Sequence, residues 1–354
     1  MDTQYQKVIW TEGMFLRPHH FQQQERYLED LSCQHLKSTV VHASGFAEYE
    51  LIAEKSSMES EVSLKSARGI MPSGAAFNLT QGDVQALRLP IGELHQVLYL
   101  ALPIYQEGAE DIVFADEPAT NARYVVDEIE LADTSEISLG TSTVQVGRPR
   151  FRLCLADDLP NGYEFLRVAR ILEVTKEGQI IEDKHYIPEI LHYQTSPKLV
   201  SWIKEILDLL LKRVDDLSLR LKQIGRSSLV DITDLMTLQT LNRYCGVFHY
   251  LRQLKQLHPE RVYREFASLA YELATFTQIH RTRDITQFPE YKHQNLQQSF
   301  EPLVRMISQD LSFVMKEPAT EIKLVSREGG LKLGKVEDMQ LFKQAQFVLS
   351  VGSN

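Results

Sequence analysis

The chain has 354 residues, 43% of them hydrophobic and 24% charged, and a formal net charge of −10. This is an ordinary globular composition, and the length predicts two or three domains, because single cores rarely grow beyond about 250 residues. The acidic balance argues against a general nucleic-acid binder, whose phosphate contacts need clustered Lys and Arg.

The cysteines and the N-terminus indicate the compartment. Cys33, Cys154 and Cys245 lie far apart and form no CxxC pair. They suit neither a disulfide framework nor a zinc site, so we expect three reduced thiols. The N-terminus lacks the basic and apolar parts of a signal peptide, and no apolar stretch approaches the roughly 20 residues that cross a bilayer. We therefore predict a soluble, cytoplasmic protein.

The first distinctive segment places large apolar side chains around a glycine and a proline. It runs Trp10-Thr11-Glu12-Gly13-Met14-Phe15-Leu16-Arg17-Pro18-His19-His20-Phe21. Such a non-periodic segment is typical of a loop held in a groove, since apolar surface of this size is seldom left in water. Pro18 disfavours a helical Arg17, so a polar helix is expected from about His19. The loop either contacts a partner or packs inside its own domain.

From about Gly45 the pattern changes to that of short strands. Alternating or β-rich segments occur at 48–53, 61–67, 96–102, 122–129, 150–155 and 163–171. Turn residues separate several of them, as at 72–74, 160–162 and 177–178. This punctuation predicts an antiparallel β-sandwich or barrel-like domain over 1–192.

A long helix follows, from about Ser196 to Ile224. Its apolar residues recur at alternating steps of three and four: Val200, Ile203, Leu207, Leu210, Val214, Leu217, Leu221 and Ile224. A 3.5-residue repeat is typical of a left-handed coiled coil between chains. The same pattern also suits a helix buried within the bundle of its own chain.

Three further amphipathic helices are expected, one from about Asp231, one from His258-Pro259-Glu260 and one near Leu296–Val314. Pro259 suits a first helical position, where its missing N–H costs nothing. The second of these helices has the seam Val262, Phe266, Leu269, Leu273 and Phe276. Together with the long helix they predict a helical bundle over 193–316.

Strand-like segments return at 321–325, 331–333 and 346–351. Two or three strands cannot bury a core of their own. We therefore expect 317–354 to be the start of a further, incomplete domain.

A search for chemistry finds no nucleotide-binding glycine loop, no GxSxG elbow and no HExxH motif. His19 and His20 are adjacent, but neighbouring side chains diverge and no spaced carboxylate or histidine completes a site. Asp157-Asp158 precedes a Pro-Asn-Gly turn, where Asp commonly binds backbone amides. We predict no catalytic, cofactor-binding or metal-binding residues.

The opening motif closely resembles the N-terminal signature of the TssK (ImpJ/VasE) family of type VI secretion baseplate proteins. The resemblance covers Trp10 to Gln24 and continues at 178–188, 258–260 and 269–276. It therefore spans most of the chain.

The resemblance implies an α+β multidomain protein with a β-sandwich shoulder, a helical neck and a C-terminal head. Family members are homotrimers that join the wedge subunits TssF and TssG to the membrane complex of TssJ, TssL and TssM. This implies a non-enzymatic adaptor in the cytoplasm, docked to the inner-membrane complex, with no nucleic acid and no membrane insertion. The opening motif would contact the wedge, and the helical seams would hold the trimer. The head, and with it the membrane-complex contact, is expected to be incomplete here.

Two other functions are compatible with the residues. A phage-type receptor-binding or baseplate subunit would share the architecture and bind host-surface glycans. A metal-dependent hydrolase would use His19 and His20 and purify with stoichiometric zinc.

Overall fold

We analysed a computed structural model of the chain. It describes residues 5–55, 60–115, 121–135, 140–223, 229–277, 284, 286, 288–312, 324–326, 329 and 331–336. The chain divides into two compact units, Met1–Ser312 and Phe313–Asn354, which are treated separately.

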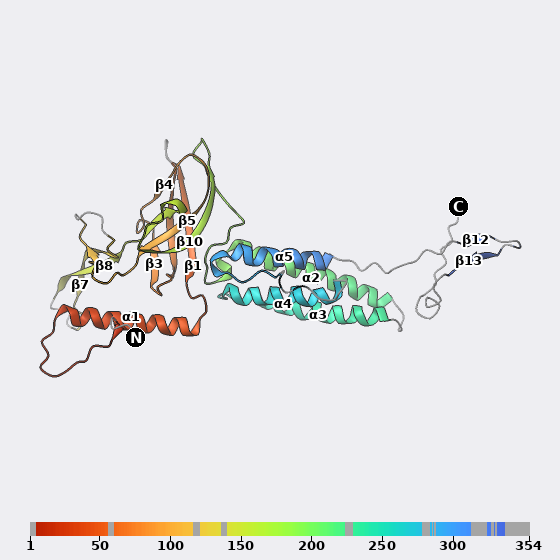
Figure 1. Ribbon diagram of the computed structural model, residues 1–354, viewed down its shortest axis with the longest axis horizontal. Helices are drawn as coiled ribbons and strands as arrows, with labels where there is room; N and C mark the ends of the chain where they lie inside the picture. The colour runs from red at the N-terminus through yellow and green to blue at the C-terminus, as the bar shows by residue number, and fades with distance from the viewer. Residues whose placement is uncertain are drawn as a thin grey trace. The chain divides into compact units, whose positions relative to one another are not determined.

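Helix α1 (Pro18–Thr39) follows the opening segment (Figure 1). Pro18 occupies its first turn, and Arg17 is extended, with φ −132° and ψ 157°, as expected before a proline. The helix ends where the Val40 N–H donates to the Leu36 carbonyl at 2.9 Å. None of its residues is buried.

Two antiparallel sheets form the β part of the first unit. One contains β1 (Gly45–Lys55), β2 (Ser60–Ile70), β3 (Ala76–Thr80) and β4 (Leu87–Leu89). The other has the order β11 (Ile180–Glu182), β10 (Tyr163–Val174), β5 (Gly92–Pro103) and β9 (Arg152–Leu155). Their buried faces share one core, in which the rings of Phe77 and Phe151 lie 5.4 Å apart.

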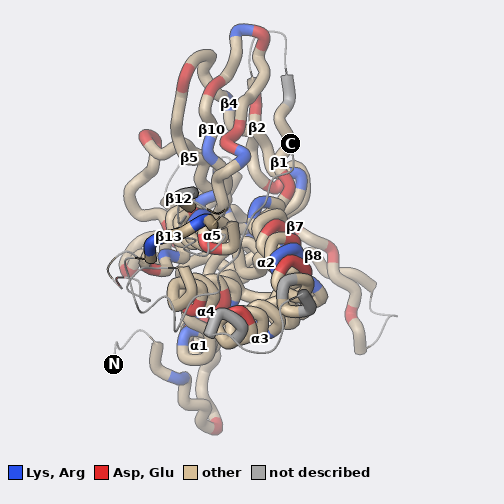
Figure 2. The backbone as a smooth tube through the Cα atoms, turned by 90° about the vertical axis from the view of Figure 1, so that its right-hand side faces the viewer, with Lys and Arg blue, Asp and Glu red and all other residues tan. Residues whose placement is uncertain are grey.

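A third, small sheet contains β6 (Ile112–Val113), β7 (Tyr124–Ala132) and β8 (Thr141–Pro149). Beyond the first three residues of β7, the ladder of β7 and β8 is exposed on both faces except at half-buried Val146. In Figure 2 the tube leads away from the central sheets beyond the β7 and β8 labels. The sequence predicted β7 in part, and β8 was missed.

The helical part is a bundle of α2 (Pro197–Gln223), α3 (Leu229–Leu251), α4 (Pro259–Thr277) and α5 (Leu296–Ser312) (Figure 1). Each helix packs on the next along the chain, and contact between α2 and α5 closes the bundle. Pro302 lies inside α5. The predicted combination of antiparallel sheets with a helical bundle, an α+β fold, is confirmed.

The sandwich and the bundle are joined through buried groups. The Tyr193 hydroxyl donates to the Leu251 carbonyl at 2.7 Å, and the Thr195 hydroxyl donates to the Ala47 carbonyl at 2.6 Å. The hydrophobic core continues from the sheets into the helices. Sheets and bundle therefore form one compact unit, although the sequence suggested a boundary near residue 192.

In the second unit, β12 (Leu324–Ser326) pairs antiparallel with β13 (Lys332–Gly334). The strand predicted at 346–351, and most of the predicted domain 317–354, lie outside the described residues.

Candidate interaction surfaces

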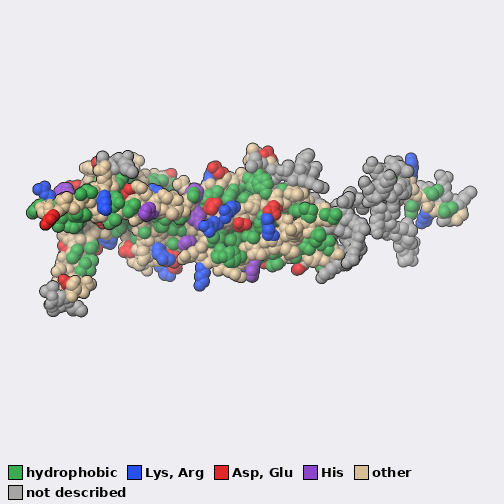
Figure 3. All heavy atoms as spheres, turned by 90° about the horizontal axis from the view of Figure 1, so that it is seen from below, with side chains coloured by type: hydrophobic (Ala, Val, Ile, Leu, Met, Phe, Trp, Pro, Cys, Tyr) green, Lys and Arg blue, Asp and Glu red, His purple; other side chains and the backbone are tan. Residues whose placement is uncertain are grey.

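The opening segment and α1 expose large apolar side chains. Phe15 is 79% exposed, and Ile9 is 70% exposed. The other exposed apolar residues of this surface are Trp10, Leu16, Phe21 and Leu28. Figure 3 shows hydrophobic side chains along the side of the molecule on which α1 lies. The exposure of Phe15 does not fit the interpretation of this loop as core.

Short contacts hold the opening loop against the start of α1. The Arg17 backbone N–H donates to His20 Nδ1 at 3.0 Å, and the Trp10 ring lies 6.3 Å from those of His20 and Phe21. Gly13 has φ +80°, in the region that favours glycine, where the chain turns between Thr11 and Met14. Of the remaining motif residues, Glu12, Pro18 and His19 are exposed and Met14 is half-buried. The motif is thus a largely uncovered surface.

The predicted seam of α2 lies mostly inside its own chain. Ile203, Leu207, Leu210 and Leu217 are at most 3% exposed, whereas Val200 is 42% exposed. Val214 and Leu221 are half-buried, and Ile224 lies outside the described residues. In α4, Phe266, Leu269 and Leu273 are buried and Phe276 is half-buried. The buried positions pack the bundle of one chain, so they leave no surface for a sister copy.

A different face of α2 and α3 is open. Leu219 on α2 and Ile232, Leu235 and Met236 on α3 are each between 54% and 60% exposed. The three α3 residues follow the i, i+3, i+4 spacing of one helix face. We call these four residues the α2–α3 patch.

Three histidines from distant segments stack where the sandwich meets the bundle. The His293 ring lies 5.3 Å from His42 and 5.0 Å from His258, with interplanar angles of 16° and 17°. His293 Nε2 lies 2.8 Å from the Ser44 carbonyl oxygen, which can only accept, so Nε2 carries the proton. The Tyr291 hydroxyl, 2.9 Å away, then donates to Nδ1. Burial lowers the pKa of His293 to about 4.

His258 is fixed in the same tautomer. Its Nδ1 accepts the Glu260 backbone N–H at 3.2 Å, and its Nε2 lies 3.1 Å from the His42 carbonyl oxygen. Burial lowers its pKa as well. Both rings therefore use both nitrogens while neutral, which suits a structural joint and leaves no lone pair for a metal.

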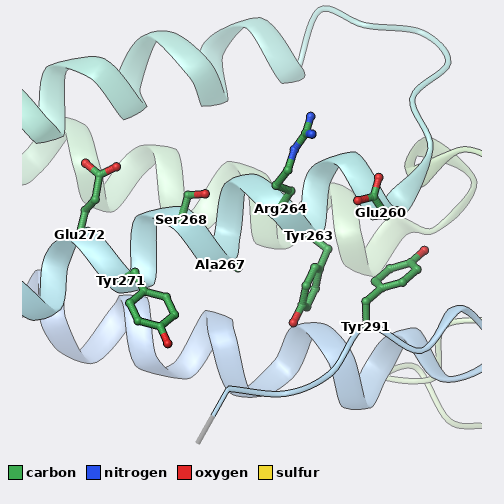
Figure 4. Close-up of a pocket in the computed structure, with 8 residues that line it drawn as sticks. All are labelled: Glu260, Tyr263, Arg264, Ala267, Ser268, Tyr271, Glu272 and Tyr291. Atoms are coloured by element: carbon green, nitrogen blue, oxygen red, sulfur yellow. The ribbon is translucent and has the colours of Figure 1, made fainter. Parts of the chain in front are cut away.

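A shallow cavity of about 480 Å³ lies on α4 and is shown in Figure 4. Its walls are Glu260, Tyr263, Arg264, Ala267, Ser268, Tyr271, Glu272 and Tyr291. Glu260 and Glu272 lie at opposite ends, and Arg264 points away from the tyrosines (Figure 4). The Glu272 carboxylate already accepts the Tyr244 hydroxyl at 2.8 Å and also contacts Arg243. The lining therefore does not bring an acid and a base together.

The part of the chain that the structure describes has neither a cluster of metal-binding side chains nor a helix suited to crossing a membrane. No group of three or more His, Cys, Asp or Glu side chains there is placed to hold a metal ion, and His19 and His20 join no such group. No helix in that part of the chain has the length and apolar content of a membrane span.

Comparison with known proteins gives consistent matches. Residues 20–354 match the family described as bacterial type VI secretion, VC_A0110, EvfL, ImpJ, VasE. The type VI secretion baseplate component TssK1 of Pseudomonas aeruginosa is 33% identical over 347 residues, which is 98% of this chain and 78% of that protein.

Solved structures agree with this. A crystal structure of TssK is 34% identical, with a TM-score of 0.83 over 96% of this chain and 76% of that one. A chain from a TssK–TssF–TssG baseplate subcomplex, seen by cryo-electron microscopy, has the same fold at 23% identity. Its TM-score is 0.71 over 87% of this chain and 99% of its own.

An antiparallel sandwich continuous with a helical bundle is thus the architecture of a type VI secretion baseplate component. Within that class, the chain belongs to the TssK family, also called ImpJ or VasE.

Proposed function

We propose that this chain is a non-enzymatic, homotrimeric adaptor of the type VI secretion baseplate. Its sandwich end binds the wedge subunits TssF and TssG, and its C-terminal head binds the membrane complex of TssJ, TssL and TssM. The bundle acts as the spacer between these two ends. The adaptor works in the cytoplasm, docked to the inner-membrane complex.

One observation carries the wedge contact: α1 has no buried residue, and the segment before it exposes Ile9, Phe15 and Leu16. A helix with so little burial gains most of its stability from packing against something else. An apolar surface of this kind marks a site of protein contact. The solved TssK–TssF–TssG subcomplex, one chain of which has this fold, supports the choice of partner.

The chemistry supports an adaptor over an enzyme. The α4 cavity is shallow and its carboxylates are apart. Histidines elsewhere use their ring nitrogens in hydrogen bonds between segments. Single contacts of moderate strength gain from three linked copies, because each later contact forms within the same assembly.

The test is binding of purified TssF–TssG complex to immobilised chain. Phe15→Ala should weaken binding at least about tenfold while the thermal unfolding temperature stays unchanged, since Phe15 is exposed in the free chain. Ile9→Ala and Ile91→Ala form a matched pair, because both isoleucines are exposed and only Ile9 belongs to the apolar surface of the opening segment and α1. Ile9→Ala should weaken binding, and Ile91→Ala should not. Equal binding by all three variants and the wild type would contradict the proposal.

A further inference from the structure

The exposed arm formed by β7 and β8 has an open outer edge. All nine residues of β8 pair with β7, from Thr141 opposite Ala132 to Pro149 opposite Tyr124, without a bulge. Among the described sheets β8 has no neighbour on its other side. Alternate backbone N–H and C=O groups on that side are therefore unpaired, and a two-stranded ladder is marginally stable in water.

From Thr141 to Gly147 the outer edge lacks the features that protect natural edge strands, and Arg148 and Pro149 follow at its inner end. Lysines, prolines within the strand and bulges normally prevent such edges from pairing with other chains. From Thr141 to Gly147, β8 has no charged residue and is rich in Thr and Val, which favour strands. This segment is suited to receive another strand.

The arm also has one apolar face. Residues opposite each other in an antiparallel pair point to the same side, and Ile129 lies opposite Val144. Leu131 lies on this side, and so does Val146. Ile129, Leu131 and Val144 are 39%, 49% and 39% exposed. The apolar face ends directly at the open edge, so an added strand would extend it.

The charges indicate which partner fits. Asp127 and Arg148 lie at the inner end of the apolar side and pair with each other at 3.6 Å. Glu128 and Glu130 on the polar face have no cationic partner among the described residues. A strand added beside β8 would lie two strand spacings, about 10 Å, from β7. A long Lys or Arg side chain on the added strand can span this distance and reach these carboxylates. A second copy of the arm would present Thr141–Gly147, which has no Lys or Arg, and so would bring no cation there to pair with these carboxylates.

We propose that the outer edge of β8 binds an extended segment of a partner protein by strand addition. The segment has β-branched or other apolar residues on one side and Lys or Arg on the other. This inference rests on the proposed function, within which the segment belongs to the TssF–TssG wedge. The backbone supplies the hydrogen bonds, and the alternating side chains supply the selectivity.

The first test is amide hydrogen exchange of residues 141–148 in the free chain and in complex with TssF–TssG. Strand addition should slow exchange of the outward-facing amides at least about tenfold in the complex. If the complex forms and these amides are unchanged, the inference fails and the proposed function stands. If no complex forms, both fail. Protection that grows with the concentration of the free chain would instead show pairing between copies and overturn the inference.

The second test separates the two faces of β8. Val144→Glu places a charge on the apolar face and should weaken wedge binding at least about tenfold. Its neighbour Thr143 is also exposed and lies on the polar face, so Thr143→Glu should retain binding. Glu128→Gln with Glu130→Gln should weaken binding and reduce its dependence on salt. Equal binding by Val144→Glu and Thr143→Glu would overturn the inference.

Discussion

At the scale of single residues, His293 makes the stability of the joint depend on pH. Its pKa falls from an ordinary 6.5 to about 4 because it is buried against His258, His42 and Tyr291. Glu260, which lies next in the cluster, raises the pKa of His258 without offsetting its burial. The unfolded chain therefore binds a proton more readily than the folded chain.

We expect the full contribution of His293 above about pH 6.5 and its progressive loss as the pH falls toward 4. One pKa unit corresponds to about 1.4 kcal/mol, so the fall from 6.5 to about 4 limits the loss to about 3.5 kcal/mol. Denaturant titrations at several pH values measure it. His293→Gln, which retains a donor and an acceptor, should flatten this dependence. His35→Gln, at an exposed site on α1, should not change it. An unchanged slope in His293→Gln would contradict the assignment.

This cluster shows a limit of sequence reasoning. The sequence drew attention to His19 and His20, which are adjacent. In the structure His20 Nδ1 accepts the Arg17 backbone N–H at the start of α1, and His19 is exposed. His42, His258 and His293 share no spacing or motif, since the tertiary fold alone brings them together. The opening motif was found because its apolar residues are contiguous.

At the scale of elements, the α2–α3 patch is where we place contact between copies in the proposed trimer. Leu235→Glu should shift the molecular mass from trimer toward monomer at micromolar concentration, since burying an unpaired charge costs several kcal/mol. Gln239→Glu is the control on the same helix, at an exposed position that is already polar. Sedimentation or mass photometry reads out both. A trimer that tolerates Leu235→Glu would place the contact elsewhere.

Periodicity predicted these helices well. The starts expected near Ser196 and at Pro259 lie within a residue of those of α2 and α4. It did not settle what each seam packs against, because a 3.5-residue repeat serves a partner helix in the same chain as well as one in another chain. Leu210 is fully buried within its own chain, whereas Leu235 on α3 is exposed. β8 was missed because its Thr, Ser and Gln residues dilute the apolar alternation.

At the scale of the whole first unit, the core runs without interruption from the sheets into the bundle. Tyr193→Phe removes the hydroxyl that donates to the Leu251 carbonyl and leaves that carbonyl without this partner. A loss of about 1–3 kcal/mol is expected. Because the sheets and the bundle share one core, we expect the free energy of unfolding to fall by the same amount in both. The fluorescence of buried Trp202, in a Trp10→Phe background, reports the bundle, and amide exchange in β5 and β10 reports the sheets. A loss confined to one part would show that they unfold separately.

The domain boundary predicted near residue 192 lies where the strands give way to the helices. The change from alternation to helical periodicity is real, and it marks a change of secondary structure. Whether two parts share a core depends on residues such as Tyr193, whose ring is buried and whose hydroxyl reaches the end of α3. That contact joins positions 58 residues apart, and no local pattern encodes it.

The bare state of α1 links helix formation to assembly. The side chains of α1 that contact the rest of the chain are at most half-buried, such as the Cys33 thiol that donates to the Ser73 carbonyl at 2.9 Å, so α1 gains less stability from packing than a buried helix does. Any partner that recognises only the ordered form must then draw on part of its binding free energy to complete the ordering. Such coupling lowers the affinity for a given contact area and keeps the contact reversible.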